Sequence, residues 1–126
     1  MNLPVEFCVV FVTTPSEEVA EKIAKTLVEE GVAACVNILT QVRSIYRWKG
    51  RVEDEREALM VIKTRFSLFD NLKGIVRSMH PYSVPEVIAL PIQGGTEEYL
   101  RWMEEVTSAS GLKDTLSGSS TPFSSP

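Results

Sequence analysis

The sequence is poor in the residues that build metal centres and disulfide frameworks: it has two cysteines and one histidine among 126 residues. Cys8 and Cys35 are far apart in the chain and lie among apolar residues, which is typical of reduced, buried thiols in a cytoplasmic protein. No CxxC or HExxH pair is present, so we expect no closed zinc site within one chain. G-x-S-x-G and P-loop motifs are also missing. We therefore expect no catalytic residues and a protein that is not an enzyme.

The sequence also lacks an excess of basic residues and a long apolar run. Thirteen Lys and Arg stand against seventeen Asp and Glu, for a net charge of −4, whereas a nucleic-acid binder needs a basic surface to displace counterions. The longest apolar run, Phe7 to Val12, is too short to cross a bilayer. No basic segment precedes it, as a secretory signal would require. We expect no nucleic-acid or membrane partner and a cytoplasmic location.

The last part of the chain differs in composition from the rest. Fourteen of the twenty residues from Thr107 to Pro126 are Ser, Thr, Gly or Pro. Such a segment buries too little apolar surface to offset its conformational entropy. We predict one folded domain over residues 1–106 and a flexible tail over residues 107–126.

Apolar periodicity and turn residues predict the order of the elements. Thr14, Pro15 and Glu17 form a capping-box pattern for the first helix, which Gly31 ends. Lys49 and Gly50 supply the turn of a long hairpin. The predicted elements are a strand at 7–12, a helix from the Thr14 cap to Gly31, a hairpin over 32–64, a helix from Ser67 to before Pro81, a strand at 87–92, and a helix capped by Thr96 and running to Val106.

This order, β-α-β-β-α-β and then a further helix, predicts an α+β fold of the ferredoxin-like (split β-α-β) type with a long hairpin and an extra C-terminal helix. Such a sheet carries its helices on one face. The first and third strands are apolar on both sides, so the other face also needs a cover, and we predict an oligomer. Tyr46 and Trp48, at the hairpin tip, are predicted to clamp a neighbouring subunit. A recognition surface for an anion and a solvated, cross-strand paired hairpin are the alternatives.

His80, the only histidine, begins a loop that contains two prolines and is therefore stiff. Stiff loops hold functional side chains well, and His80, Tyr82 and Glu86 are close enough in sequence to converge. The alternative is an ordinary helix-to-strand connection with a hydrogen-bonded histidine.

Several motifs, in this order and at this spacing, resemble the CutA family, the divalent-cation tolerance proteins. The resemblance covers residues 6–104. The motifs are Ala33-Ala34-Cys35-Val36-Asn37-Ile38, Ser44-Ile45-Tyr46-Arg47-Trp48-Lys49-Gly50, Ile62-Lys63-Thr64, His80-Pro81-Tyr82-Ser83-Val84-Pro85-Glu86-Val87-Ile88-Ala89-Leu90-Pro91-Ile92 and Tyr99-Leu100-Arg101-Trp102.

The resemblance implies a cytoplasmic homotrimer, similar in architecture to PII-type proteins, whose sheets face the three-fold axis. It implies a non-enzymatic role in divalent-cation (copper) tolerance, with a metal ion or small ligand bound weakly at subunit clefts. Copper or another divalent cation is then a ligand that folding does not require. The alternative is a PII-like signalling or adaptor trimer for a metabolite or a partner protein.

The resemblance also implies candidate site residues. His80 matches the histidine before Pro-Tyr that is proposed to bind metal. Some relatives have a second histidine and a cysteine near the end of the first strand, and here those positions are Met79 and Val12. We therefore predict a metal site at His80 with Met79 as a soft donor. The implied ligand cleft consists of Trp48, Lys63, Tyr82, Glu86 and Trp102.

Overall fold

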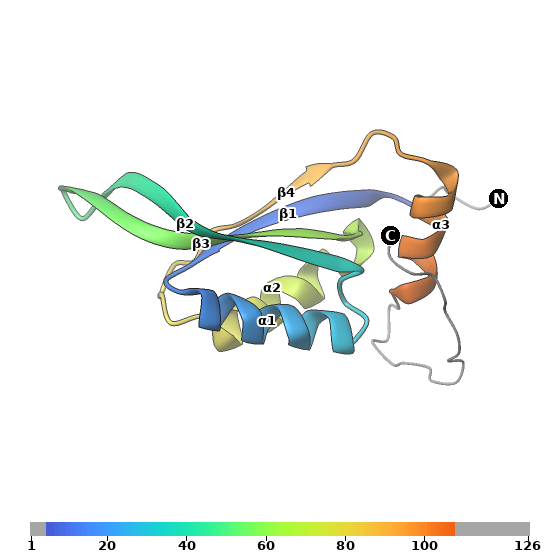
Figure 1. The fold of residues 1–126 in the computed structure, drawn as a ribbon, viewed down its shortest axis with the longest axis horizontal. Coiled ribbons are helices and arrows are strands. Elements are labelled where there is room, and N and C mark those ends of the chain that lie inside the picture. Colours follow the sequence, from blue (N-terminus) through green and yellow to red (C-terminus); the bar gives the residue numbers. More distant parts are fainter. Residues whose placement is uncertain (1–4, 108–126) are drawn as a thin grey trace.

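The computed structural model describes residues 5–107, which form a mixed α/β fold with a four-stranded sheet and three α-helices (Figure 1). The element order is the predicted one. The elements are β1 (Phe7–Thr14), α1 (Glu17–Glu29), β2 (Cys35–Trp48), β3 (Arg51–Arg65), a 3-10 turn (Phe66–Leu68), α2 (Phe69–Met79), β4 (Val87–Pro91) and α3 (Glu97–Val106).

The sheet is antiparallel throughout, with the strand order β2-β3-β1-β4. The two apolar runs of the sequence therefore form the central strands β1 and β3. Helices α1 and α2 both cover the same face of the sheet, and α3 lies at the end opposite the hairpin tip (Figure 1). No helix among residues 5–107 has the length and apolarity needed to span a membrane.

The core lies between the sheet and helices α1 and α2. Strand residues alternate between two faces, and every second residue of β1 and of the second half of β3 is buried. Fully burying one such side chain stabilises the fold by about 1.5–3 kcal/mol. The largest fully buried apolar side chains are Val10, Val12, Ile23, Leu27, Met60, Ile62, Leu68, Leu72, Val76 and Met103.

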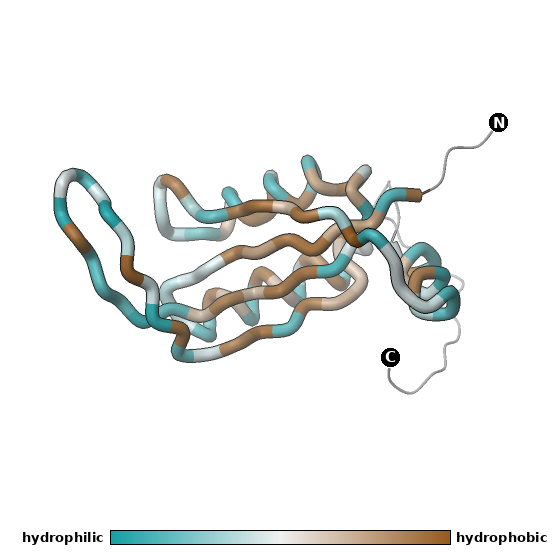
Figure 2. The backbone as a smooth tube through the Cα atoms, turned by 90° about the horizontal axis from the view of Figure 1, so that it is seen from above, coloured by the Kyte–Doolittle hydropathy of each residue, from teal (hydrophilic) through white to brown (hydrophobic). Residues whose placement is uncertain are grey.

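The other face of the sheet, which we call the open face, is also apolar. It carries the alternate residues of β1 and β3, which are only half-buried, and the residues of β4 that pair with them. Ile88 is opposite Phe11 and is 51% exposed, and Leu90 is opposite Val9 and is 46% exposed. Hydrophobic residues recur along all the strands that form this face (Figure 2). The prediction that the central strands are apolar on both sides is thus confirmed.

The β2–β3 hairpin projects beyond the helices (Figure 1). Its turn is at Lys49 and Gly50, as predicted, and both residues have positive φ angles (51° and 79°). Two consecutive left-handed residues make the tight turn that matches the twist of a hairpin. The register shifts between Leu39 and Val42, and Gln41 within this bulge also has a positive φ of 60°. The bulge sets which β2 side chains share a face with which β3 side chains near the tip.

Two predicted helix starts are wrong in detail. Ser16 caps α1, because its hydroxyl accepts a hydrogen bond from the Val19 amide. Thr14 stays in β1 and donates its hydroxyl to the Ser16 carbonyl, so the capping box does not form. Ser67 lies within the 3-10 turn, and no side chain caps α2. The predicted Thr96 cap of α3 is confirmed by its bond from the Tyr99 amide.

Thr107, the first residue of the predicted tail, packs with the folded residues. It is buried, it accepts a hydrogen bond from Arg65 Nε at 2.8 Å, and its hydroxyl donates to the Met103 carbonyl at 2.8 Å. Residues 108–126, the rest of that tail, lie outside the described residues.

Candidate functional site

The structure divides the predicted cleft residues into two groups. Trp48, Tyr82 and Glu86 line one pocket between the projecting hairpin and the loop that precedes β4. Lys63 and Trp102 lie near the other end of β3, beside α3. Trp48 pairs with Arg51, and the strand rises by twelve residue steps from Arg51 to Lys63, which span roughly 40 Å. One subunit therefore does not bring all five residues together.

The pocket at the hairpin has a volume of about 620 Å³. Strands β2 and β3 form one wall, and the loop from His80 to Glu86 forms the other. We call it the acidic pocket, because four of its lining residues are glutamates and none is lysine or arginine. It is lined by Thr13, Ser44, Ile45, Tyr46, Trp48, Glu53, Glu55, Glu57, Tyr82, Ser83, Val84 and Glu86.

Three of the four carboxylates share one face of β3, because Glu53, Glu55 and Glu57 alternate along the strand. Asp54, between them, points away and forms a two-bond ion pair with Arg43. That pair holds the pKa of Asp54 below its usual value. The three glutamates form no ion pair among the described residues. The negative charge of the acidic pocket is therefore not neutralised from within the described part of the subunit.

Two tyrosines that line the pocket form hydrogen bonds to its carboxylates. Tyr82 donates its hydroxyl to Glu57 Oε2 at 3.1 Å, and Tyr46 donates to Glu55 Oε1 at 3.4 Å. Burial, the bond to Glu57 and the nearby negative charges raise the pKa of Tyr82 to about 12. Desolvation and the charges of Glu55 and Glu57 also raise the pKa of Tyr46. Both phenols stay protonated and act as donors at neutral pH.

Titration of Tyr82 is expected to lower stability at alkaline pH. The unfolded chain loses the phenolic proton near the usual pKa of 10.0, and the folded protein only near 12. The contribution of Tyr82 to the free energy of unfolding is therefore intact below about pH 10 and is lost as the pH rises towards 12. We expect Tyr82→Phe to flatten this alkaline decline, measured as urea midpoints between about pH 9 and pH 11. A decline equally steep in wild type and variant would contradict this assignment.

His80 is buried (7% exposed) at the base of the same loop. Its Nε2 lies 2.7 Å from the Thr13 carbonyl oxygen, and its Nδ1 accepts a hydrogen bond from the Tyr82 amide at 3.1 Å. This assigns a neutral ring with the proton on Nε2. The ring also lies 4.9 Å from the Tyr82 ring. His80 thus positions Tyr82 above Glu57, and a metal can bind the ring only if one of these bonds breaks.

Met79 packs against the hydrophobic core. Within residues 5–107, no group of three or more His, Cys, Asp and Glu side chains is arranged to hold a metal ion. The metal site at His80 and Met79 stays a prediction.

A second cluster surrounds Lys63 at the opposite end of β3. Lys63 is directly across from Cys35 in the β2–β3 register. Its ammonium donates a hydrogen bond to Asn37 Oδ1. Tyr99 of α3 lies near Cys35, whose proximity contributes to the raised pKa of the phenol, and its ring is 5.3 Å from the Trp102 ring, centroid to centroid. Lys63 and Trp102 thus belong to one neighbourhood, which also contains Cys35, Asn37 and Tyr99.

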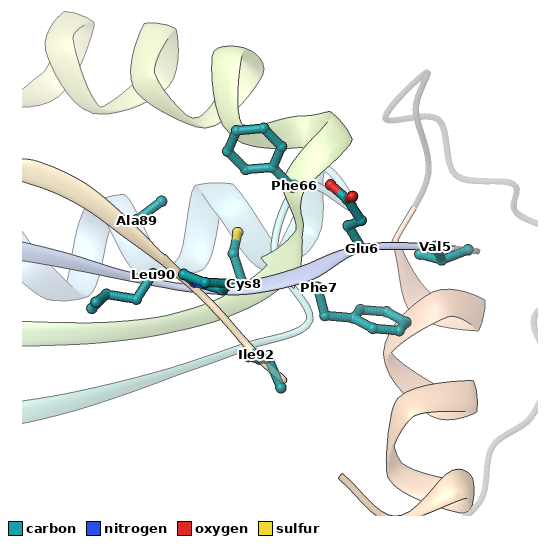
Figure 3. A pocket seen from close by; sticks show the side chains of 9 residues that line it. Val5, Glu6, Phe7, Cys8, Phe66, Ala89, Leu90 and Ile92 are labelled. Atoms are coloured by element: carbon teal, nitrogen blue, oxygen red, sulfur yellow. The ribbon is translucent and has the colours of Figure 1, made fainter. Parts of the chain in front are cut away.

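A further hollow, of about 410 Å³, lies between the start of β1 and the end of β4 (Figure 3). Glu6 is its only charged lining residue, and the thiol of Cys8 forms part of its base. The remaining lining is apolar or backbone, so we assign it no ligand.

Three of the four glutamates of the acidic pocket, Glu53, Glu55 and Glu57, are absent from the predicted cleft. Their alternation at positions 53, 55 and 57 was the available signal, because it places them on one face and separates them from Asp54. No sequence pattern indicated that Cys35 and Tyr99 lie close together, because Tyr99 comes from α3, which is far along the chain from Cys35.

Comparison with known proteins gives a consistent family assignment. The family described as CutA1 divalent ion tolerance protein matches residues 8–106. The divalent-cation tolerance protein CutA of Thermus thermophilus is 54% identical over 99 residues, which are 79% of this chain and 96% of that protein. Protein CutA of Mus musculus is 54% identical over 97 residues, which are 77% of this chain and 55% of that protein. The chain thus spans about half the length of the mouse relative.

Solved structures agree with the fold. The crystal structure of CutA1 from Oryza sativa has a TM-score of 0.82 and 46% identity, with 84% of this chain and 97% of that chain covered. The structure of the divalent cation tolerance protein from Thermus thermophilus has a TM-score of 0.79 and 53% identity, with 81% and 99% covered.

Proposed function

Because the chain belongs to the CutA1 divalent ion tolerance family, we propose that it is a trimeric, non-enzymatic binding protein of divalent-cation tolerance. It binds a divalent cation or a small cationic ligand weakly, at clefts between subunits. The acidic pocket is the observation that carries this proposal. Carboxylate oxygens are the ligands that hard divalent cations prefer, and four carboxylates without a basic residue favour a cation over an anion. Because the side chains of residues 5–107 in one subunit are not arranged to hold a metal ion by themselves, ligands from a neighbouring subunit would have to complete the coordination.

Burial makes Glu57 the anchor of this pocket. Its side chain is only 6% exposed, and within residues 5–107 its carboxylate accepts a hydrogen bond from the neutral hydroxyl of Tyr82 and forms no ion pair. A buried carboxylate without a cationic partner is unfavourable, so a bound cation would stabilise it. The aromatic rings of Tyr46, Trp48 and Tyr82 in the same lining suit an organic cation as well as a metal ion.

The trimer part of the proposal rests on the open face. We infer a ferredoxin-like subunit from the β-α-β-β-α-β order and the β2-β3-β1-β4 sheet. An apolar sheet face without helices is most simply covered by copies of itself. The projecting hairpin, with Tyr46 and Trp48 near its tip, then reaches a neighbouring subunit. The acidic pocket, which is lined by residues of this hairpin, becomes a cleft between subunits.

A binding role is favoured over catalysis because relatives are named as tolerance proteins. The same names give no support to the alternative of a PII-like signalling trimer. We place the protein in the cytoplasm because both cysteines are free. The names of two relatives carry other locations, chloroplastic for Arabidopsis thaliana and periplasmic for Archaeoglobus fulgidus.

Calorimetric titration of chelator-treated protein with Mn²⁺ tests the cation site. Mn²⁺ is preferred as the probe because Cu²⁺ binds most nitrogen and sulfur donors regardless of purpose. The double variant Glu53→Gln/Glu86→Gln removes two pocket charges and leaves the Tyr82–Glu57 bond in place. We expect its Mn²⁺ affinity to fall at least about tenfold, which corresponds to the loss of about 1.4 kcal/mol.

Two matched variants control this experiment. Glu29→Gln/Glu30→Gln removes two exposed glutamates at the end of α1 and is expected to leave Mn²⁺ affinity unchanged. His80→Asn tests the predicted metal site, and we expect a much smaller loss than in the pocket variant. If only His80→Asn lowers the Mn²⁺ affinity, the cation site is at His80 and not in the acidic pocket. If wild type and all the variants bind Mn²⁺ equally weakly, the proposal that the protein binds a divalent cation is wrong.

A further inference from the structure

The two thiols of the protein have opposite environments. Cys8 is buried on the helix-covered face of β1, and burial raises the pKa of its thiol to about 11. It is therefore protonated and inert at neutral pH. Cys35 is half-buried at the start of β2, an edge strand, on the open face. Cys35 is thus the more exposed of the two thiols in the described subunit.

An amine lies beside this thiol. Cys35 and Lys63 are directly opposite residues in the antiparallel β2–β3 ladder, and such residues have Cβ atoms about 4.5–5.5 Å apart on the same face of the sheet. Asn37 ties the two side chains together. Its Oδ1 is 3.9 Å from the Cys35 sulfur and accepts a hydrogen bond from the Lys63 ammonium.

Two further observations describe the surroundings of this pair. Tyr99, from α3, lies near Cys35, and burial together with the proximity of this sulfur raises the pKa of the phenol. Lys63 forms no ion pair with a carboxylate of the described residues, so no acid draws its nitrogen away. The Lys63 nitrogen and the Cys35 sulfur therefore stay near one shared oxygen.

We propose that Cys35 and Lys63 are a peroxide-sensitive pair that forms a reversible covalent sulfur–nitrogen bond between β2 and β3. In the first step the Cys35 sulfur attacks one oxygen of hydrogen peroxide. The S–O bond forms, the O–O bond breaks, the second oxygen leaves as water with the thiol proton, and the sulfur is oxidised by two electrons to a sulfenic acid.

In the second step the Lys63 amine, after its ammonium has lost a proton to solvent, attacks the sulfenic sulfur. The S–N bond forms, the S–O bond breaks, and the hydroxyl leaves as water with a proton from the nitrogen. A sulfenic acid condenses with a nearby nitrogen in this way to form a sulfenamide. The product removes the positive charge of Lys63 and links the edge strand to its neighbour. A thiol reductant reverses it.

Mass spectrometry of the full chain, treated with hydrogen peroxide under native conditions, tests this proposal. We expect the subunit mass to fall by about 2 Da through the loss of two hydrogens, and digestion to yield one peptide pair joined between Cys35 and Lys63. Dithiothreitol is expected to restore the original mass.

Matched variants separate the pair from general oxidation. Lys63→Arg keeps the positive charge but offers a guanidinium that stays protonated, so we expect Cys35 to proceed to the sulfinic acid, about 32 Da heavier, with no linked peptide. Cys35→Ser should abolish the link, and Cys8→Ser should preserve it. The proposal is overturned if wild type and Lys63→Arg give the same products, or if Cys8 is oxidised as readily as Cys35. Neither outcome depends on cation binding at the acidic pocket.

Discussion

Replacing Ile88 by aspartate is expected to convert the proposed trimer, about 42 kDa or three times 14.0 kDa, into folded monomers. Ile88 is half-exposed on the open face of the described subunit, so a monomer tolerates the charge. In a trimer the same position becomes buried, and each unpaired carboxylate there costs several kcal/mol. Sedimentation or light scattering at micromolar concentration measures the mass, and circular dichroism confirms that the monomer is folded.

The matched control is Val28→Asp, which introduces the same charge at an apolar, 45% exposed position on α1, away from the open face. It should remain trimeric. Trp48→Ala tests the hairpin separately and should weaken assembly more than it destabilises a subunit. If wild type is monomeric at micromolar concentration, the trimer proposal fails. If Ile88→Asp remains trimeric while Trp48→Ala dissociates, the hairpins hold the subunits together instead of the sheet faces.

Truncating Leu27 to alanine is expected to lower the free energy of unfolding by about 2–5 kcal/mol. Leu27 is fully buried (0% exposed) where α1 packs on the sheet. Its removal loses the transfer free energy of the side chain and leaves a cavity that the surrounding core fills only in part. Urea denaturation at one fixed protein concentration measures the change, because assembly makes apparent stability concentration-dependent.

Val28→Ala, at the next position of the same helix, controls for effects on the helix itself. Val28 lies outside the core, and alanine has the higher helix propensity, so we expect a change within about 0.5 kcal/mol. Equal losses in Leu27→Ala and Val28→Ala would contradict the assignment of Leu27 to the core.

Weak cation binding fits a ligand that folding does not require. A ligand that binds only the native state stabilises it by about 2.7 kcal/mol even at one hundred times its dissociation constant. A core of fully buried side chains from β1, β3, α1 and α2 contributes far more than that. The cation is therefore expected to modify the acidic pocket and its cleft without deciding whether the chain folds.

Much of the fold was predictable from local sequence. The apolar runs at 7–12 and 58–62 predict central strands because only such strands are buried on both faces. Lys49 and Gly50 predict the turn because two left-handed residues are needed there. The Thr14 cap was wrong because two hydroxyl residues, Thr14 and Ser16, compete for the same helix start, and the Thr14 hydroxyl bonds to the Ser16 carbonyl instead. Local pattern does not decide such a competition.

The candidate site depended more strongly on tertiary structure. Trp48, Tyr82 and Glu86 line one pocket of the described subunit, and their role as a ligand cleft between subunits stays a prediction. Lys63 lies at the other end of β3, so within one subunit it does not meet them, and its place in a cleft between subunits stays a prediction. A residue pattern does not report the distance covered by a long strand.

The element order, the two-sided apolar strands and the family follow from the residues alone, since these depend on residue type and spacing along the chain. Which side chains meet depends on how the elements pack. The β2 bulge sets the hairpin register, and α3 brings Tyr99 to the Cys35 sulfur. The His80 loop places Tyr82 over Glu57. Such contacts join residues that are distant in the chain, so their geometry arises only when the sheet and helices come together.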